Sequence, residues 1–251
     1  TQSVAPLLAE KLPVENLITT RTLKIIGVGE STVEQNITPA LSEFISGGLE
    51  IGYCARAGEV DVRLTASGEG GVERIAQAEA IVCEKLGARI YGVDDEQLEE
   101  ILIRQLTASG QTLAVAESCT GGLLTHRLTN VPGASAVFLA GHCTYSNAAK
   151  QNTLGVLPET LAEHGAVSEP VARQMAEGTR AKHGADYALA TTGIAGPDGG
   201  TAEKPVGTVF IVYATPEGTD VVNACFATDR VTFKQLVVQQ AMNELRLKIC
   251  K

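Results

Sequence analysis

The stretch Thr112-Leu-Ala-Val-Ala-Glu-Ser-Cys-Thr-Gly-Gly122 decides the fold of the second half of the chain. Its first five residues form a nearly continuous apolar run, which is typical of a β-strand that helices cover on both faces. The run ends at Glu117, and a helix is predicted over 121–129. The stretch therefore predicts a buried strand that turns sharply into a helix and carries Ser118 at the turn.

Apolar runs of the same kind recur along the rest of the chain, at 137–144, 187–192, 206–214 and 221–226. Further helices are predicted after Asp94, with a buried face at Leu98, Ile101, Leu102 and Leu106, and over 158–163, 169–183 and 232–249. Strands interleaved with helices predict a three-layer α/β/α domain over residues 93–251. We expect a mixed sheet, because the short turn 216–218 joins the last two strands.

Residues 21–92 follow a different pattern, which predicts a small α+β domain. A strand starts at Thr22, and the capping-box residues Ser31 and Glu34 predict a helix from Ser31 to about Ile45. The other predicted elements are strands at 51–53, 60–66 and 90–92 and a helix over 72–86. Residues 1–20 are predicted to be an arm that packs on another part of the protein.

Composition narrows the classes of protein. The net charge of −9 and the pI of about 5.0 argue against a nucleic-acid partner, because neutralising phosphates needs clustered Lys and Arg. The six cysteines include no C-x-x-C pair, which argues against a zinc site and favours reduced thiols in the cytosol. No stretch approaches the roughly 20 apolar residues that span a bilayer. We therefore expect a cytoplasmic protein with no membrane partner.

Three segments follow predicted strands with polar residues and glycines. In the first, residues 117–122, a helix N-terminus and flexible glycines suit a phosphate or an oxyanion, although Ser118 could merely cap the helix. The second, 145–150, ends in Lys150, which is either a surface lysine or a general base beside a hydroxyl nucleophile. The third, 191–207, is either a functional loop or a flexible connector.

Familiar hydrolase patterns do not account for these segments. Ser118 lacks the flanking glycines of a nucleophile elbow, and Lys150 follows Ser146 by four residues, so the S-x-x-K signature is absent. The four histidines have no metal-ligand spacing, and a Ser-His-Asp triad has little support.

Taken together, the segments resemble the CinA family. The matching motifs are AVAESCTGG (114–122), TYSNAAK (144–150), GAVSEPVA (165–172), TTGIAGPDGG (191–200) and KPVGTV (204–209). The resemblance implies that residues 93–251 form the family's C-terminal domain, the nicotinamide-nucleotide amidohydrolase. It also implies that 21–92 form its KH-like module and that 1–20 are the end of a MoaB-like pyrophosphatase domain, which this sequence lacks.

The KH-like module is expected to be structural or dimer-forming, and the protein is expected to be a homo-oligomer. Its Gly68-Glu-Gly-Gly71 loop fits the G-x-x-G of RNA-binding KH modules, where a loop clamps the nucleic-acid backbone. Glu69 stands where a basic residue would help, so RNA binding is not expected.

The resemblance also assigns roles within the C-terminal domain. Ser118 would be the nucleophile, Lys150 the base, and Thr192 a proton relay or orienting group. Backbone N–H groups of residues 119–122 would stabilise an oxyanion, and Arg230 would hold the substrate phosphate. The implied site holds neither metal nor cofactor, and its substrate-binding residues are Glu117, Cys119, Thr120, Gly121, Gly122, Tyr145, Asn147, Gly193, Ala195, Gly196 and Arg230.

The chain departs from the family pattern at two positions beside Arg230. The family has Gly and Arg where this chain has Thr228 and Lys234. A lysine holds a phosphate as a point charge and not through a bidentate fork, which affects affinity or substrate range more than reaction type. A non-enzymatic adaptor linked to competence or DNA damage, and an amidase of another small carboxamide, are the alternatives to nicotinamide mononucleotide deamidation.

Overall fold

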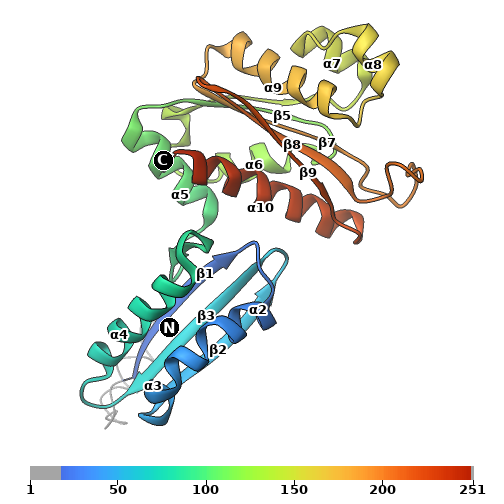
Figure 1. Cartoon of the computed structure of the whole chain (residues 1–251). Coiled ribbons are helices and arrows are strands. Elements are labelled where there is room, and N and C mark those ends of the chain that lie inside the picture. The colour runs from blue at the N-terminus through green and yellow to red at the C-terminus, as the bar shows by residue number, and fades with distance from the viewer. Residues whose placement is uncertain (1–17, 250–251) are drawn as a thin grey trace, which may run out of the picture. The chain divides into compact units, whose positions relative to one another are not determined.

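The computed structural model describes residues 18–249, and the chain divides into two compact units, Thr1–Asp95 and Glu96–Lys251 (Figure 1). Most of the predicted arm lies outside the described residues. Its last three residues are part of a strand, because β1 (Ile18–Ile26) pairs from Ile18 onward with β3. No helix within 18–249 is long and apolar enough to cross a membrane.

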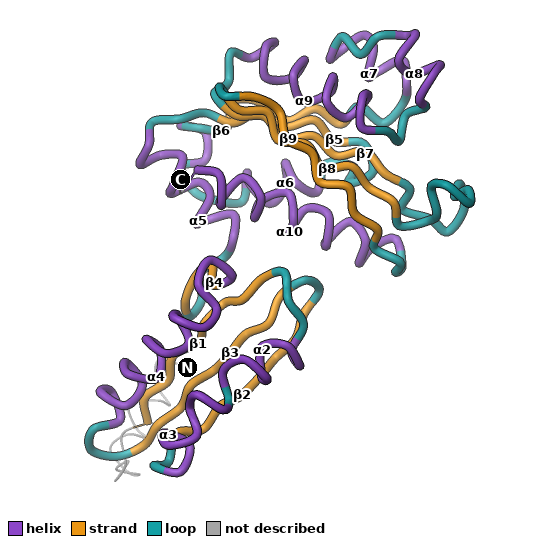
Figure 2. Tube along the Cα trace, viewed as in Figure 1, coloured by secondary structure: helices purple, strands orange, loops and turns teal. Residues whose placement is uncertain are grey.

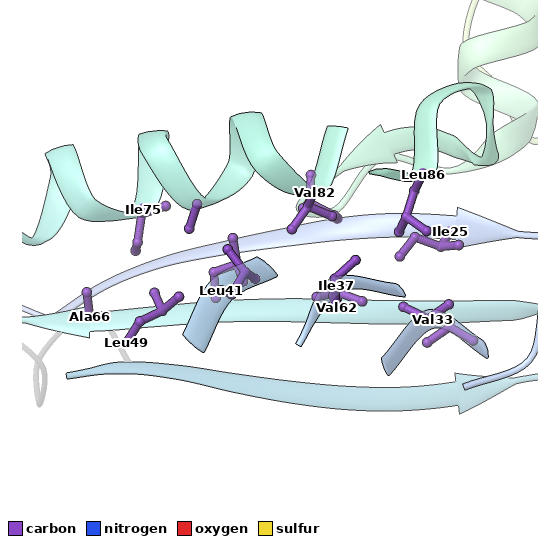
Figure 3. Packing of buried hydrophobic residues seen from close by; sticks show 14 residues of the cluster. Ile25, Val33, Ile37, Leu41, Leu49, Val62, Ala66, Ile75, Val82 and Leu86 are labelled. Carbon is purple, nitrogen blue, oxygen red and sulfur yellow. The ribbon is translucent and has the colours of Figure 1, made fainter. Parts of the chain in front are cut away.

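The first unit is a four-stranded antiparallel sheet in the order β2-β3-β1-β4. The helices on it, shown with their core side chains in Figure 3, bury apolar residues of the central strands β1 and β3. This confirms the predicted α+β class. Besides β1, the elements are α2 (Glu30–Ile37), α3 (Ser42–Ser46), β2 (Leu49–Arg56), β3 (Glu59–Ser67), α4 (Gly71–Leu86) and β4 (Ile90–Val93).

Two details of this unit differ from the sequence prediction. The helix expected from Ser31 to Ile45 is broken after Ile37 by a 3₁₀ turn at Pro39–Leu41, because proline has no N–H to donate and its ring disfavours a preceding helical turn. The helix also begins at Glu30 with Gly29 as its N-cap, so the predicted capping box of Ser31 and Glu34 is wrong.

The second unit contains a mixed five-stranded sheet in the order β6-β5-β7-β8-β9. β5 is parallel to β6 and β7, whereas β8 is antiparallel to β7 and β9. The strands are β5 (Leu113–Glu117), β6 (Phe138–Cys143), β7 (Tyr187–Gly193), β8 (Thr208–Thr215) and β9 (Gly218–Cys225).

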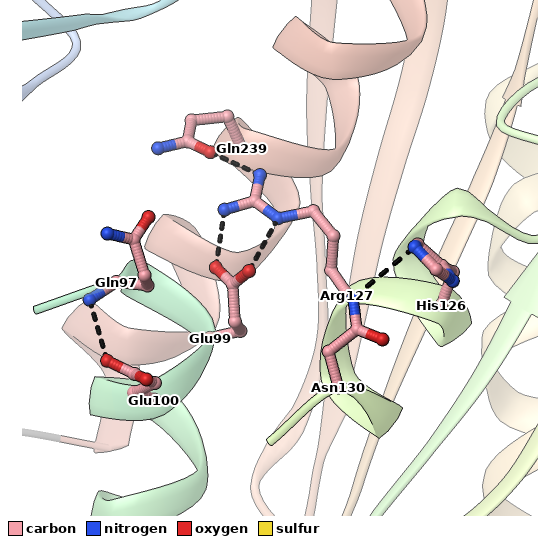
Figure 4. A network of polar contacts seen from close by, with 7 residues as sticks. All are labelled: Gln97, Glu99, Glu100, His126, Arg127, Asn130 and Gln239. Atoms are coloured by element: carbon pink, nitrogen blue, oxygen red, sulfur yellow. Dashed lines mark hydrogen bonds and ion pairs between the residues drawn. The ribbon is translucent and has the colours of Figure 1, made fainter.

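Helices cover both faces of this sheet, which confirms the predicted three-layer α/β/α fold (Figures 1 and 2). One layer is α7 (Asn147–Leu154), α8 (Pro158–His164) and α9 (Glu169–His183); the other is α5 (Leu98–Ser109), α6 (Leu123–Thr129) and α10 (Arg230–Ile249). Sequence analysis did not predict α7. Figure 4 shows how the second layer is tied together: Arg127 of α6 donates to Glu99 of α5 and to Gln239 of α10.

The strand directions bring distant segments to one edge of the sheet. β5, β6 and β7 run parallel, and β9, antiparallel to β8, runs in their direction as well. Their carboxyl ends therefore lie at the same edge, the usual place for a ligand in an α/β sheet. Ser118, the segment before Lys150, Thr192 and Arg230 follow or end these four strands.

Candidate active site

Ser118 occupies a tight turn between β5 and α6. Its backbone N–H donates to the carbonyl of Thr191 (2.9 Å), and its carbonyl accepts from Gly121 (3.2 Å). Gly121 and Gly122 take φ values of +62° and +94°, which other residues rarely adopt. This backbone conformation explains the two glycines in the turn. Ser118 is 8% exposed.

Lys150 points from α7 to the Ser118 hydroxyl. Ser146 caps this helix by accepting from the N–H of Ala149 (3.1 Å), which fixes where the helix begins and, with it, the direction of Lys150. The Lys150 Nζ lies 2.9 Å from Ser118 Oγ and donates to the carbonyls of Thr144 (2.8 Å) and Tyr145 (3.5 Å).

Burial makes Lys150 an unusual lysine. It is 1% exposed, and desolvation lowers its pKa from the ordinary value of 10.5, although the thiols of Cys119 and Cys143 act in the opposite direction. A neutral amine has two N–H groups and one lone pair. With the N–H groups directed at the carbonyls of Thr144 and Tyr145, the lone pair faces Ser118 and can accept its proton.

The turn offers fewer free N–H groups for an oxyanion than predicted. Gly122 donates to the Glu117 carboxylate (3.0 Å), and Gly121 donates to the Ser118 carbonyl, so neither is available. Within the described residues, the N–H of Thr120 donates to no backbone or side-chain acceptor, and the N–H of Cys119 contacts only its own thiol. The oxyanion site predicted over 119–122 is therefore narrowed to these two residues.

Glu117 was predicted to bind substrate, and its surroundings argue against this. Its side chain is 0% exposed and lies under the start of α6, where it accepts four hydrogen bonds from protein groups. A carboxylate enclosed in this way has no face left for a ligand.

The two threonines at the end of β7 point to different partners. Thr192 donates its hydroxyl proton to the carbonyl of Ala166 (2.8 Å), so its predicted relay role is not supported by a direct hydrogen bond to Ser118 or Lys150 within the described chain. Thr191, which sequence analysis missed, shares a hydrogen bond of 2.8 Å with Thr120. Strand alternation explains the split, since neighbouring residues face opposite sides of a sheet.

Arg230 begins α10 and is held at the site by two contacts. It donates to the carbonyl of Gly196 (2.9 Å) and to the hydroxyl of Tyr145 (2.6 Å). Lys234 lies one turn later on the same side of the helix. Its Nζ would lie 3.5 Å from a Cβ placed on Gly121, so Lys234 borders the nucleophile turn.

The other predicted site residues have mixed surroundings. Asn147 is exposed at the start of α7, and Ala195 is 6% exposed. A side chain at Gly193 would meet the backbone of Thr208, which explains the glycine by strand packing. Burial raises the pKa of the Cys119 thiol to about 12, so this thiol is protonated near neutral pH and is not the nucleophile.

No metal site is evident in the described part of the chain, which holds no group of three or more His, Cys, Asp or Glu side chains placed to share an ion. Sequence analysis missed three residues that contact the predicted site residues. The carbonyl of Thr144 accepts from Lys150, the carbonyl of Ala166 accepts from Thr192, and the hydroxyl of Thr191 bonds to Thr120. Thr144 lies in a quoted motif, but nothing in its residue type announces that its carbonyl would receive Lys150.

With this fold and this site described, comparison with known families shows that the chain belongs to the CinA family. Residues 95–249 match the CinA C-terminal domain, and residues 20–92 match the KH domain of the damage-inducible protein CinA. The family predicted from the sequence motifs is therefore confirmed.

Known proteins similar to this chain carry the same family name. A CinA-like protein from Anaeromyxobacter sp. (strain K) is 42% identical over 227 residues, which cover 90% of this chain and 56% of that protein. The chain thus spans little more than half the length of this relative. Its fold resembles the crystal structure of a Competence-Damaged Protein (CinA) Superfamily Protein from Klebsiella pneumoniae 700603, with a TM-score of 0.59, 37% identity, and coverage of 61% of this chain and 96% of that one.

The competence/damage inducible protein CihA from Agrobacterium tumefaciens is similar to the same degree. The TM-score is 0.57 and the identity 39%, over 62% of this chain and 98% of that structure. Both solved structures therefore match a region the size of the second unit.

Proposed function

We propose that the second unit is an amidohydrolase that converts nicotinamide mononucleotide and water to nicotinate mononucleotide and ammonia. The observation that carries this proposal is the 2.9 Å contact between Ser118 Oγ and the buried Nζ of Lys150. A serine beside a desolvated amine is a nucleophile paired with its base. Membership of the CinA C-terminal domain family supports the substrate, because that family includes deamidases of this nucleotide.

In the first half of the reaction, Ser118 Oγ attacks the carboxamide carbon while Lys150 accepts the hydroxyl proton. The carbonyl oxygen gains negative charge and is stabilised by the N–H groups of Cys119 and Thr120, an effect commonly worth about 3 kcal/mol. The carbon–nitrogen bond then breaks. Lys150 returns its proton to the departing amine, so that ammonia leaves and Ser118 carries the nicotinate mononucleotide as an ester.

In the second half, Lys150 is neutral again and accepts a proton from a water molecule. The hydroxide attacks the ester carbon, the bond to Ser118 Oγ breaks, and the proton passes from Lys150 to the serine. The products are the free carboxylate and the original enzyme. No charge has to be created in the enclosed site before the substrate arrives.

The substrate phosphate would bind to the cations at the start of α10. The guanidinium of Arg230 is already oriented by Gly196 and Tyr145 and keeps further N–H donors for an anion. Lys234 supplies a second positive charge near Gly121. Two cations at the start of α10, one of them beside the nucleophile turn, suit a mononucleotide better than a bare carboxamide.

An ammonia-release assay with two substrates tests the proposal. We expect ammonia from nicotinamide mononucleotide, much less from free nicotinamide, and none above background from Ser118→Ala with either compound. Equal release from both compounds would favour an amidase of small carboxamides. Release from neither would contradict the enzyme proposal and favour a non-enzymatic adaptor.

A further inference from the structure

Beyond the residues assigned above, one buried charge in the second unit has no role in the reaction as written. Resting on the proposed function, we propose that Glu117 is a positioning residue, whose carboxylate holds the turn 118–122 in the conformation that directs Ser118 to Lys150 and the N–H groups of Cys119 and Thr120 to the oxyanion.

The Glu117 carboxylate accepts four hydrogen bonds from the segment that follows the nucleophile. One carboxylate oxygen accepts from the N–H groups of Gly122 and Leu124, both at 3.0 Å. The other accepts from the N–H of Thr125 (2.8 Å) and from its hydroxyl (2.7 Å). A single side chain therefore ties the end of the turn and the start of α6 back to the strand that precedes the nucleophile.

At the start of α6, the Glu117 carboxylate takes the place that an external anion could occupy. The first N–H groups of a helix have no partner within the helix and carry a partial positive charge. At the start of α6 these groups already donate to Glu117, inside the protein. We therefore place the oxyanion one step earlier on the turn, at the N–H groups of Cys119 and Thr120, which do not donate to Glu117.

Glu117 is also connected to Lys150, the base, by hydrogen bonds through Thr144. Its backbone carbonyl accepts from the N–H of Thr144 (2.8 Å), and the carbonyl of Thr144 accepts from Lys150 Nζ (2.8 Å). Through its N–H and its carbonyl, Thr144 thus connects the residue before the nucleophile to the base. A displacement of Glu117 would reach both members of the catalytic pair.

Strand geometry explains how one residue does this. Ala116 packs in the core beneath α9, so the next residue along β5 faces the opposite layer, which contains α6. Ser118 then lies on the α7 side again, where Lys150 is. Glu117 must be the buried residue under α6 because Ser118 is the residue facing the base.

The substitution Glu117→Gln tests the proposal, since it keeps size and shape. An amide oxygen still accepts two hydrogen bonds, but the amide nitrogen accepts none, so two of the four donors lose their partner. We expect kcat for ammonia release to fall about tenfold or more while KM changes less than about threefold, the pattern of a lost transition-state geometry.

A matched control separates positioning from loss of stability. Met242 is fully buried in α10 and has no place in the site, so Met242→Ala should lower the melting temperature and leave kcat unchanged well below that temperature. Both variants are measured at a temperature where circular dichroism shows that they are folded. If the kcat of Glu117→Gln then equals that of Met242→Ala, Glu117 has only a structural role and the proposal is overturned.

A second pair of variants covers the case in which Glu117→Gln does not fold. Thr125→Val removes only the hydroxyl that donates to Glu117, and Thr125→Ser retains it. We expect a lower kcat for the valine variant and recovery in the serine variant, by a factor of about three. Equal kcat values for the two would overturn the proposal.

A measurement that does not use the carboxamide keeps the two proposals distinguishable. Acetylation of Ser118 by p-nitrophenyl acetate, followed through the mass of the intact protein, should be about tenfold slower in Glu117→Gln than in the wild type and absent in Ser118→Ala. If the wild type is acetylated but releases no ammonia, the substrate assignment fails while the role of Glu117 stands on the acetylation rates. If the wild type releases ammonia but is not acetylated at that serine, the deamidation stands, while Ser118 as nucleophile and the positioning role of Glu117 are overturned.

Discussion

At the scale of single residues, the site depends on a lysine that burial keeps from being an ordinary cation. An exposed lysine would be protonated near neutral pH and could not accept a proton from Ser118. Lys150 is enclosed, and its Nζ partners are two carbonyls and a hydroxyl, none of which carries the negative charge that would favour the ammonium form. The same enclosure that is costly for a charged lysine makes a neutral one a base.

Lys234 gives a prediction at this scale, because its Nζ lies close to Gly121 and one helical turn from Arg230. We expect Lys234→Arg to lower KM for nicotinamide mononucleotide by about threefold to tenfold, since a guanidinium can bind phosphate in a bidentate way, and to leave kcat nearly unchanged. Steady-state ammonia release measures both constants. Lys248→Arg is the matched control, because Lys248 pairs with Asp220 at the far end of α10. If Lys234→Arg and Lys248→Arg have the same KM, a phosphate role for Lys234 is contradicted.

At the scale of elements, the strand and turn at 112–122 could be predicted from sequence, but α7 could not. An apolar run followed by two glycines determines a buried strand and a turn by local physics. The helix Asn147–Leu154 has only Leu154 and Lys150 buried, so it lacks the apolar periodicity that marks a helix. Its signal was the cap residue Ser146, which sequence analysis placed in the polar segment after a predicted strand.

The approach of α7 to α9 gives a second prediction. A Cβ on Gly178 of α9 would collide with the carbonyl oxygen of Leu154, the last residue of α7. Gly178→Ala should therefore push α7 away, destabilise the second unit by about 1–3 kcal/mol, and lower kcat/KM because Lys150 lies on the displaced helix. Thermal unfolding and ammonia release measure the two effects.

Glu177→Ala is the control for this variant, since Glu177 is the exposed neighbour of Gly178 on the same helix. It should leave both the melting temperature and kcat/KM close to wild type. If Gly178→Ala behaves like this control, α7 tolerates a shift and does not fix the position of the base.

At the scale of the whole molecule, the residues that meet at the site come from four separate segments. Ser118 and Lys150 are 32 positions apart, and no local pattern states that they touch. The pairing follows from parallel strands whose carboxyl ends share an edge, and sequence analysis reached it only through resemblance to a family. Glu117 was misassigned for the same reason, because a motif does not tell which polar residues face inward.

The stability of the second unit should depend on pH through a pair of histidines, one from β6 and one from α9. His142 of β6 and His183 of α9 lie with Nε2 atoms 2.6 Å apart, and burial, followed by the charges of His183 and Lys182, lowers the pKa of His142. A lowered folded pKa means that the unfolded chain binds the proton more readily. The stability is therefore present above the unfolded value of 6.5 and is lost as the pH falls below it.

Urea unfolding of wild type and His142→Asn at about pH 7.5 and about pH 5 measures this effect. We expect the wild type to lose more stability between the two conditions than the variant, which cannot titrate at that position. An equal loss in both proteins would show that other groups set the acid sensitivity.

The measurement that tests the catalytic assignment most directly is kcat/KM against pH for wild type and Lys150→Arg. The wild-type profile should rise with pH along an acidic limb whose apparent pKa lies well below the ordinary lysine value of 10.5, because only the neutral amine accepts the proton from Ser118. Lys150→Arg, with its fold checked by circular dichroism, should be nearly inactive at every pH, since a guanidinium hardly deprotonates. Retention of more than about a tenth of wild-type kcat/KM, a barrier change below about 1.4 kcal/mol, would contradict the assignment of Lys150 as the base.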